Sequence, residues 1–254
     1  MYYKVSGKGK AVVLLHGFIE EGSMWDAVSK VLSLKYKVIV PDLEGFGNSK
    51  LETLTSKLSM EKYADDVFEM LKTEKVKSCV LLGHSMGGYV TLQFAEKFPD
   101  LLSGFGLLNS HCFEDAPEKK ENRRKGNEFI LKHGTKVFVK ELYRNLFHPS
   151  FKNEKLIATL TVKAEKYSPE ALIAANTAMI NRKGKEDVLK NAKVPVLLVG
   201  GKQDPAAPIE FFLKQSSMPP VVDFHLFDNT KHMSMFEKKK ETLSAIQNFV
   251  ERCS

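Results

Sequence analysis

Short apolar runs alternate with longer amphipathic segments in the first half of the chain. The runs that have the length of a strand are Ala11–Leu15, Lys37–Pro41, Ser78–Leu82 and Gly104–Leu108. The segments between them that have the apolar spacing of a helix are Met24–Leu34, Met60–Thr73 and Met86–Lys97. Strands without polar alternation, separated by helices, are typical of a parallel sheet covered on both faces. With right-handed crossovers, this pattern predicts a doubly wound, mostly parallel α/β sheet flanked by helices.

The pattern changes after the strand that ends near Leu108. From residue 110 to 190 no strand-like run appears, and we expect helices over Pro117–His133, Thr135–Phe147, Glu154–Lys166 and Pro169–Arg182. Strand signals return at Val194–Val199 and Val221–Phe227, followed by a closing helix near Met235–Glu251. Because the chain leaves the sheet and re-enters it, we expect residues 1–109 and 191–254 to form one core domain. Residues 110–190 are expected to form a helical cap, or lid, inserted in that core.

Composition narrows the class of protein. The chain has 254 residues, of which 43% are hydrophobic, enough for one sizeable core. The first ten residues have no apolar region of a signal peptide, and no apolar stretch approaches the roughly 18–20 residues of a membrane span. Three cysteines, far apart and odd in number, argue against a disulfide framework. We therefore expect a cytoplasmic protein without a membrane partner.

The net charge of +7 is concentrated in the middle of the chain. Residues 110–190 hold 17 lysines and arginines against 11 acidic residues. The basic residues alternate with acids at helical spacing, which is typical of a solvated helix face. This interleaving, without a recognisable binding module, argues against a nucleic-acid partner. It leaves open a mild preference for an anionic substrate.

A candidate catalytic motif is the segment Gly83-His84-Ser85-Met86-Gly87-Gly88, which follows an apolar run and precedes an amphipathic segment. This is the G-x-S-x-G pattern in the strand–turn–helix context that the motif requires. A serine on so sharp a turn takes a strained backbone conformation, and side chains two positions away would collide, so Gly83 and Gly87 are needed. We expect Ser85 to be a nucleophile held at the carboxyl edge of the sheet.

The sequence resembles the α/β-hydrolase superfamily over nearly its whole length. The landmarks are His16-Gly17-Phe18 after the first core strand, Asp42–Ser49 after the next, the Gly83–Gly88 turn, and an acid followed by a histidine near the end. The most similar groups are small, capped, cofactor-free serine esterases and C–C hydrolases. Haloalkane dehalogenases and epoxide hydrolases carry an aspartate where this chain has Ser85. Prolyl aminopeptidases usually have a tryptophan-containing turn, which is absent here.

A nucleophilic serine needs a general base, and the base needs a carboxylate that orients it. The resemblance places the base at His232, in a loop between the last strand and the closing helix, and the acid at Asp204, after the strand Val194–Val199. Asp223 and Asp228 are competing acids. The family's backbone N–H groups for an oxyanion correspond to Phe18 and Met86. The Asp42–Ser49 stretch is assigned a structural role.

We expect the substrate pocket to involve Phe18, His111 and Met233. The sequence contains no metal-ligand spacing and no nucleotide-binding motif, so we expect no cofactor. These residues predict a carboxylesterase-like hydrolase that cleaves a small carboxylic ester. A C–C bond hydrolase or lyase acting on a small anionic oxo-acid would use the same triad, and a ligand receptor could retain it. Monomer and homodimer are both open.

Overall fold

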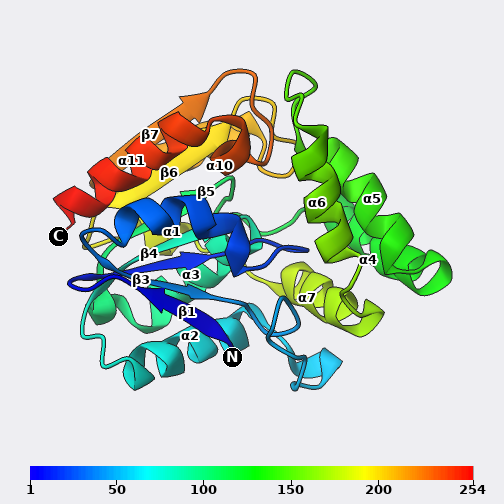
Figure 1. Ribbon diagram of the computed structural model, residues 1–254, viewed down its shortest axis with the longest axis horizontal. Coiled ribbons are helices and arrows are strands. Elements are labelled where there is room, and N and C mark those ends of the chain that lie inside the picture. Colours follow the sequence, from blue (N-terminus) through cyan, green and yellow to red (C-terminus); the bar gives the residue numbers. More distant parts are fainter. Residues whose placement is uncertain (254) are drawn as a thin grey trace.

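A sheet of seven strands forms the centre of the computed structural model, which describes residues 1–253 (Figure 1). Its strands are β1 (Tyr3–Ser6), β2 (Ala11–Leu15), β3 (Lys37–Pro41), β4 (Cys79–His84), β5 (Leu102–Leu108), β6 (Val196–Gly201) and β7 (Val222–Phe227). Their order across the sheet is β1-β3-β2-β4-β5-β6-β7, with β1 antiparallel to β3 and the other neighbours parallel. The expected doubly wound, mostly parallel fold is therefore confirmed.

Burial explains which strands the apolar pattern detects. Every residue of β2, β4 and β6 is buried, as expected for central strands covered by helices on both faces. Strand β1 was not predicted, because its four residues, Tyr3-Lys4-Val5-Ser6, alternate in polarity and contain no apolar run. It is fixed by backbone pairing with β3 rather than by an apolar run.

Helices cover both faces of the sheet. The core helices are α1 (Asp26–Leu32), α2 (Met60–Thr73), α3 (Met86–Lys97), α9 (Ile209–Ser216), α10 (Ser234–Glu237) and α11 (Lys239–Arg252). Helices α1 and α11 lie on one face, and α2 and α3 lie on the other (Figure 1). Helix α9 was not predicted. The closing helix, expected to be continuous, is interrupted at Lys238, whose φ of −128° and ψ of 53° are not helical.

The segment between β5 and β6 contains α4 (Pro117–His133), α5 (Thr135–Leu146), α6 (Glu154–Ala164), α7 (Pro169–Asn181) and α8 (Glu186–Lys190). Helices α4 to α7 lie together beyond one end of the sheet, at the right of Figure 1. The buried Asp115 carboxylate pairs with Arg182 and Arg123, both at 2.7 Å, and ties this group of helices together. Within residues 1–253, no helix combines the length and the apolar character that crossing a bilayer requires.

Candidate active site

Ser85 lies between β4 and α3 in a strained conformation, with φ of 51° and ψ of −114°. Glycines make this turn sterically feasible. A Cβ on Gly83 would lie 2.1 Å from the carbonyl oxygen of Gly87, and a Cβ on Gly87 would lie 2.6 Å from the carbonyl oxygen of His16. The turn therefore needs glycine at both positions, as the sequence predicts.

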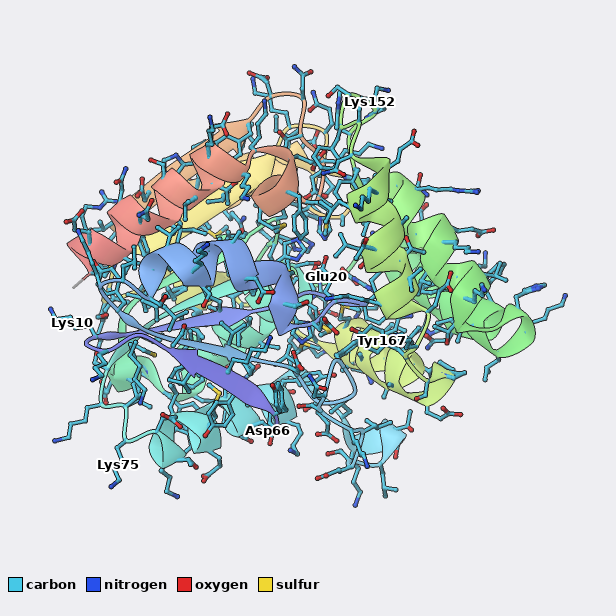
Figure 2. All side chains as sticks on the ribbon, in the orientation of Figure 1. Lys10, Glu20, Asp66, Lys75, Lys152 and Tyr167 are labelled. Carbon is cyan, nitrogen blue, oxygen red and sulfur yellow. The ribbon has the colours of Figure 1, made fainter. Side chains whose placement is uncertain are left out.

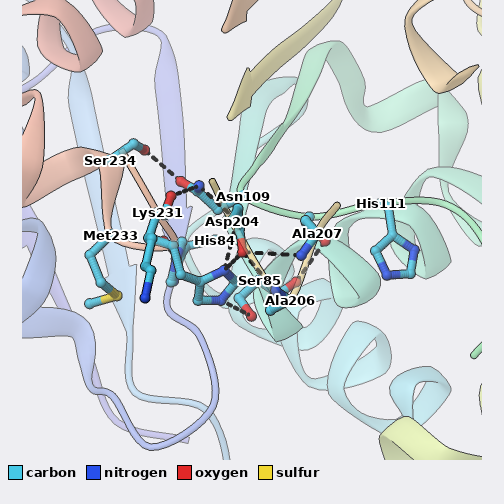
Figure 3. A network of polar contacts seen from close by, with 12 residues as sticks. His84, Ser85, Asn109, His111, Asp204, Ala206, Ala207, Lys231, Met233 and Ser234 are labelled. Carbon is cyan, nitrogen blue, oxygen red and sulfur yellow. Dashed lines mark hydrogen bonds and ion pairs between the residues drawn. The ribbon is translucent and has the colours of Figure 1, made fainter. Parts of the chain in front are cut away.

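The side chains of Asp204, His232 and Ser85 form one chain of hydrogen bonds. Asp204 and Ser85, which lie at its two ends, are labelled in Figure 3. The Nε2 atom of His232 lies 2.8 Å from the Ser85 hydroxyl oxygen, and its Nδ1 lies 2.9 Å from both carboxylate oxygens of Asp204. Burial opposes ionisation of Asp204, but the charge of His232 and hydrogen bonds from His232 and Asn109 outweigh it and lower the pKa of this carboxyl. The ionised carboxylate can therefore accept a hydrogen bond from the Nδ1–H group, which leaves Nε2 unprotonated and able to accept the serine proton.

Asp204 is held by donors on each of its oxygens. It follows β6, and its Oδ1 accepts hydrogen bonds from the N–H groups of Ala206 and Ala207 at 2.8 and 3.1 Å. Its Oδ2 accepts from the Asn109 side chain at 3.0 Å. Asn109 was not identified from the sequence, although a polar residue directly after the buried strand β5 was a usable signal. Parallel strands bring the residues that follow them to one edge, so Ser85, Asn109 and Asp204 meet there.

The backbone around His232 is fixed from several directions. The Glu237 carboxylate accepts hydrogen bonds from the N–H groups of Lys231 and Met233 at 3.1 Å. The N–H of His232 itself donates to the carbonyl oxygen of Leu146, at the end of α5, at 3.0 Å. Asn109 donates to the carbonyl oxygen of Lys231 at 2.9 Å. Neither Glu237 nor Leu146 could be linked to His232 from sequence spacing alone.

His84 links three parts of the site. Although His84 is adjacent to Ser85 in the sequence, its side chain contacts other groups. Its Nδ1 lies 3.0 Å from the Glu20 carboxylate, which also accepts from the N–H of Gly17, and its Nε2 lies 2.9 Å from the carbonyl oxygen of His232. Both ring nitrogens face acceptors, an arrangement that favours the doubly protonated ring. Burial opposes this charge, but the attraction and hydrogen bond of Glu20 outweigh it and raise the pKa of His84.

This buried pair predicts a pH dependence of stability. Because the pKa of His84 is raised in the folded state, its contribution is complete below the unfolded value of about 6.5 and is lost as the pH rises through the folded pKa. Glu20→Gln removes the carboxylate charge and is expected to reduce this alkaline loss. Urea unfolding between pH 6 and pH 9 measures the difference, with exposed Glu241→Gln as the matched control. Identical pH dependence in wild type and Glu20→Gln would contradict the assignment.

The two backbone N–H groups expected to face an oxyanion lie on adjacent segments. Met86 is the first residue of α3, where N–H groups have no acceptor inside the helix. Phe18 lies in the loop between β2 and α1, here called the β2–α1 loop (residues 16–21). A Cβ on Gly87 would lie only 2.8 and 2.6 Å from the carbonyl oxygens of Leu15 and His16, so the start of α3 lies directly against the end of β2 and the start of this loop.

The three expected pocket residues have different surroundings. Phe18 is half-buried and packs edge-on against Phe138 of α5, with ring centroids 6.3 Å apart. Met233 is fully buried beside His232. His111 lies apart from the hydrogen-bonded network in Figure 3 and contacts the rings of Tyr89, Phe113 and Phe211. Burial lowers the pKa of His111 to about 3, so its ring is neutral. Direct contact of His111 with substrate stays a prediction.

The competing acids are engaged elsewhere. Asp228 pairs with Lys202 at 2.7 Å, and Asp223 pairs with Arg252 and, at 3.1 Å, with His225. In residues 1–253 we find no group of three or more histidine, cysteine, aspartate or glutamate side chains placed to hold a metal ion.

The remaining family landmarks stabilise loops. His16 is buried, accepts from the N–H of Leu43 at 2.8 Å and donates to the carbonyl oxygen of Gly17 at 2.8 Å. The Asp42 carboxylate accepts from the N–H groups of Gly22 and Asn48 at 2.7 and 2.8 Å. The two landmarks therefore join neighbouring loops, and for His16 it is the side chain, rather than only the backbone turn, that does so.

Comparison with known proteins places this arrangement in a family. The family described as "Serine aminopeptidase, S33" matches residues 7–239. The chain belongs to this family. Its fold is the α/β-hydrolase fold of a family of hydrolases, and the resemblance stated from the four sequence landmarks is confirmed.

Three individual proteins show how similar this chain is to known sequences and structures. A thermophilic esterase from Thermogutta terrifontis has 30% sequence identity with this chain, and its structure superposes with a TM-score of 0.93. The match covers 99% of this chain and 93% of the esterase. The pimeloyl-[acyl-carrier protein] methyl ester esterase of Vibrio cholerae is 22% identical, over 99% of this chain and 98% of that protein. An uncharacterized protein of Mycobacterium tuberculosis is 32% identical over 108 residues, and the match spans only 31% of that protein's length.

Proposed function

We propose that this hydrolase is a carboxylesterase that cleaves small carboxylic esters through an acyl-enzyme intermediate on Ser85. The observation that carries the proposal is the continuous chain from Asp204 through His232 to Ser85, with the serine held in a strained turn. The similar esterases from Thermogutta terrifontis and Vibrio cholerae support an ester as the substrate class.

The geometry supports a two-step acyl transfer. His232 takes the hydroxyl proton as the Ser85 oxygen attacks the ester carbonyl, and the N–H groups of Phe18 and Met86 stabilise the oxyanion. His232 then protonates the leaving alcohol, and the acyl group stays on Ser85. In the second step His232 activates a water molecule that releases the carboxylic acid. Asp204 keeps the proton of neutral His232 on Nδ1 and stabilises the imidazolium.

A substrate panel tests the proposal. The purified chain is assayed on p-nitrophenyl esters of increasing acyl length, an aminoacyl p-nitroanilide and a C–C cleavage substrate such as a small vinylogous diketo acid. A fluorophosphonate probe reports whether Ser85 is nucleophilic. We expect ester turnover with stoichiometric labelling of Ser85. Preferential turnover of the anilide or of the diketo acid would replace the ester proposal. Labelling without any turnover would favour a ligand receptor.

Asp204→Asn tests the role of the acid. The asparagine is nearly isosteric, but its amide cannot stabilise the imidazolium and favours the wrong imidazole tautomer. We expect kcat for an ester to fall by about 10³- to 10⁴-fold, as for the equivalent change in a serine protease triad. The measurement is steady-state kinetics on a p-nitrophenyl ester. Asp228→Asn, at an exposed surface aspartate, is the matched control and should retain wild-type kcat.

A further inference from the structure

The helices between β5 and β6 contact three consecutive residues of the β2–α1 loop. The hydroxyl of Tyr143 on α5 donates to the carbonyl oxygen of Ile19 at 3.4 Å, and the hydroxyl of Tyr167, between α6 and α7, donates to that of Glu20 at 3.1 Å. Lys163 on α6 binds the Glu21 carboxylate at 2.6 Å. Figure 2 shows Glu20 and Tyr167 where this group of helices meets the α/β core.

Both tyrosines are suited to be permanent donors. Tyr143 is 1% exposed and Tyr167 is 9% exposed. Burial raises the pKa of both hydroxyls above their ordinary value of about 10, so both are protonated at neutral pH. The Tyr167 ring also packs edge-on against Phe46, with centroids 5.1 Å apart, which fixes where its hydroxyl points.

The loop that they contact is under backbone strain. Ile19 has a φ of +62°, a left-handed conformation that is unfavourable for a β-branched residue. Such a conformation costs on the order of 1–3 kcal/mol and persists only where the surroundings enforce it. The tyrosine hydroxyls bind the carbonyl groups of this residue and of the next one. The Phe18 N–H belongs to the peptide group between Gly17 and Phe18, two peptide groups before the Ile19 carbonyl, so the tyrosine hydroxyls hold the same short segment of backbone.

We propose that Tyr143 and Tyr167 are positioning residues, whose hydroxyls hold the strained β2–α1 loop so that the Phe18 N–H faces the Ser85 site. The helices between β5 and β6 thus contribute to transition-state stabilisation through the loop, in addition to any contact with substrate. The inference rests on the proposed esterase function for its catalytic consequence, because the oxyanion forms only during acyl transfer. The hold on the loop itself does not depend on that function.

Tyrosine-to-phenylalanine variants remove only the hydroxyl groups. Tyr167→Phe, Tyr143→Phe and the double variant are compared with Tyr63→Phe. Tyr63 is the matched control because it is also buried and its hydroxyl also donates to a backbone carbonyl oxygen, that of Glu44, at 3.1 Å, but it lies on α2. Three quantities are measured for each variant: kcat and KM on a p-nitrophenyl ester, affinity for a trifluoromethyl ketone that mimics the oxyanion, and hydrogen exchange of the amides of residues 17–21.

Complete loss of one oxyanion donor lowers kcat by about 10²- to 10³-fold. An N–H group that is still present but points in the wrong direction should lower kcat by a smaller factor. We therefore expect kcat to fall roughly tenfold in Tyr167→Phe and further in the double variant, with KM within about twofold of wild type. Affinity for the ketone should fall with kcat, because both depend on the oxyanion donors. Amide exchange in residues 17–21 should accelerate in these variants. Tyr63→Phe should change none of these quantities, even if its melting temperature falls.

Two results would overturn the inference. One is a double variant with unchanged amide exchange in residues 17–21, and the other is a loss of kcat that is equally large in Tyr63→Phe. If the wild-type protein cleaves no ester, the proposed function fails, but the exchange measurement still decides whether the tyrosines hold the loop. Failure of the esterase proposal and failure of the positioning inference are therefore distinguishable.

Discussion

Ser85→Ala is expected to lower kcat for an ester by about 10⁴- to 10⁶-fold, the range found when a triad serine is removed from a serine protease. In the proposed triad, Ser85 supplies the oxygen that would form the acyl bond, and this oxygen lies 2.8 Å from the Nε2 of His232. Without it, His232 can at best activate water against a substrate held by the remaining groups. The loss should appear in kcat, because the hydroxyl acts in the transition state rather than in ground-state binding.

The fold should survive this substitution. The backbone N–H of Ser85 donates to the carbonyl oxygen of Leu108 at 2.9 Å, and this bond does not involve the side chain. Thermal unfolding should therefore change little, and fluorophosphonate labelling should disappear. Ser217→Ala, at an exposed serine after α9, is the matched control and should retain both turnover and labelling. Turnover in Ser85→Ala above one-hundredth of the wild-type rate would refute the nucleophile assignment.

The sequence was sufficient to predict six of the seven strands and the three groups of the proposed triad. Central strands of a parallel sheet are apolar throughout, so β2, β4 and β6 stand out as runs. Ser85 follows β4 and Asp204 follows β6, whereas His232 lies between β7 and α10. Chain order relates all three to the family. The apolar runs of the strands and the chain order of the serine, acid and histidine in the family were therefore enough to select the three residues.

The groups that support the triad could not be predicted in the same way. Glu20 and His84 are 64 residues apart, and Tyr167 lies 147 residues from Glu20. Each contact depends on how loops and inserted helices pack, which has no periodic signature in the sequence. Helix α9 and the break at Lys238 were missed for a related reason, because short elements are fixed by tertiary contacts more than by local propensity.

Gly83→Ala is expected to reduce both stability and activity. The added Cβ would lie 2.1 Å from the carbonyl oxygen and 2.3 Å from the carbonyl carbon of Gly87. Both atoms belong to the backbone at the start of α3, so no side-chain rotation can relieve the clash. Forcing extra atoms into a packed site typically costs about 1–3 kcal/mol, and a rigid backbone contact places this case at the upper end. Urea unfolding measures the loss.

Activity should fall independently of the loss of stability. Relieving the clash requires α3 to move away from β4, which displaces Ser85 and the Met86 N–H together. A displacement of about 1 Å can cost 10²-fold in rate, so kcat of the fraction that is folded should fall by at least this factor.

Gly126→Ala is the matched control for the glycine substitution. Gly126 lies inside α4, and its added Cβ would meet Phe138 at an ordinary contact distance of 3.5 Å. Alanine should therefore stabilise the protein by roughly 0.5–1 kcal/mol without changing kcat, because glycine is unfavourable inside a helix. Replacement of glycine by alanine is thus expected to lower the free energy of unfolding at position 83 and to raise it at position 126. If Gly83→Ala were as stable and active as wild type, α3 would not need to approach β4 so closely, and crowding would not explain the strained conformation of Ser85.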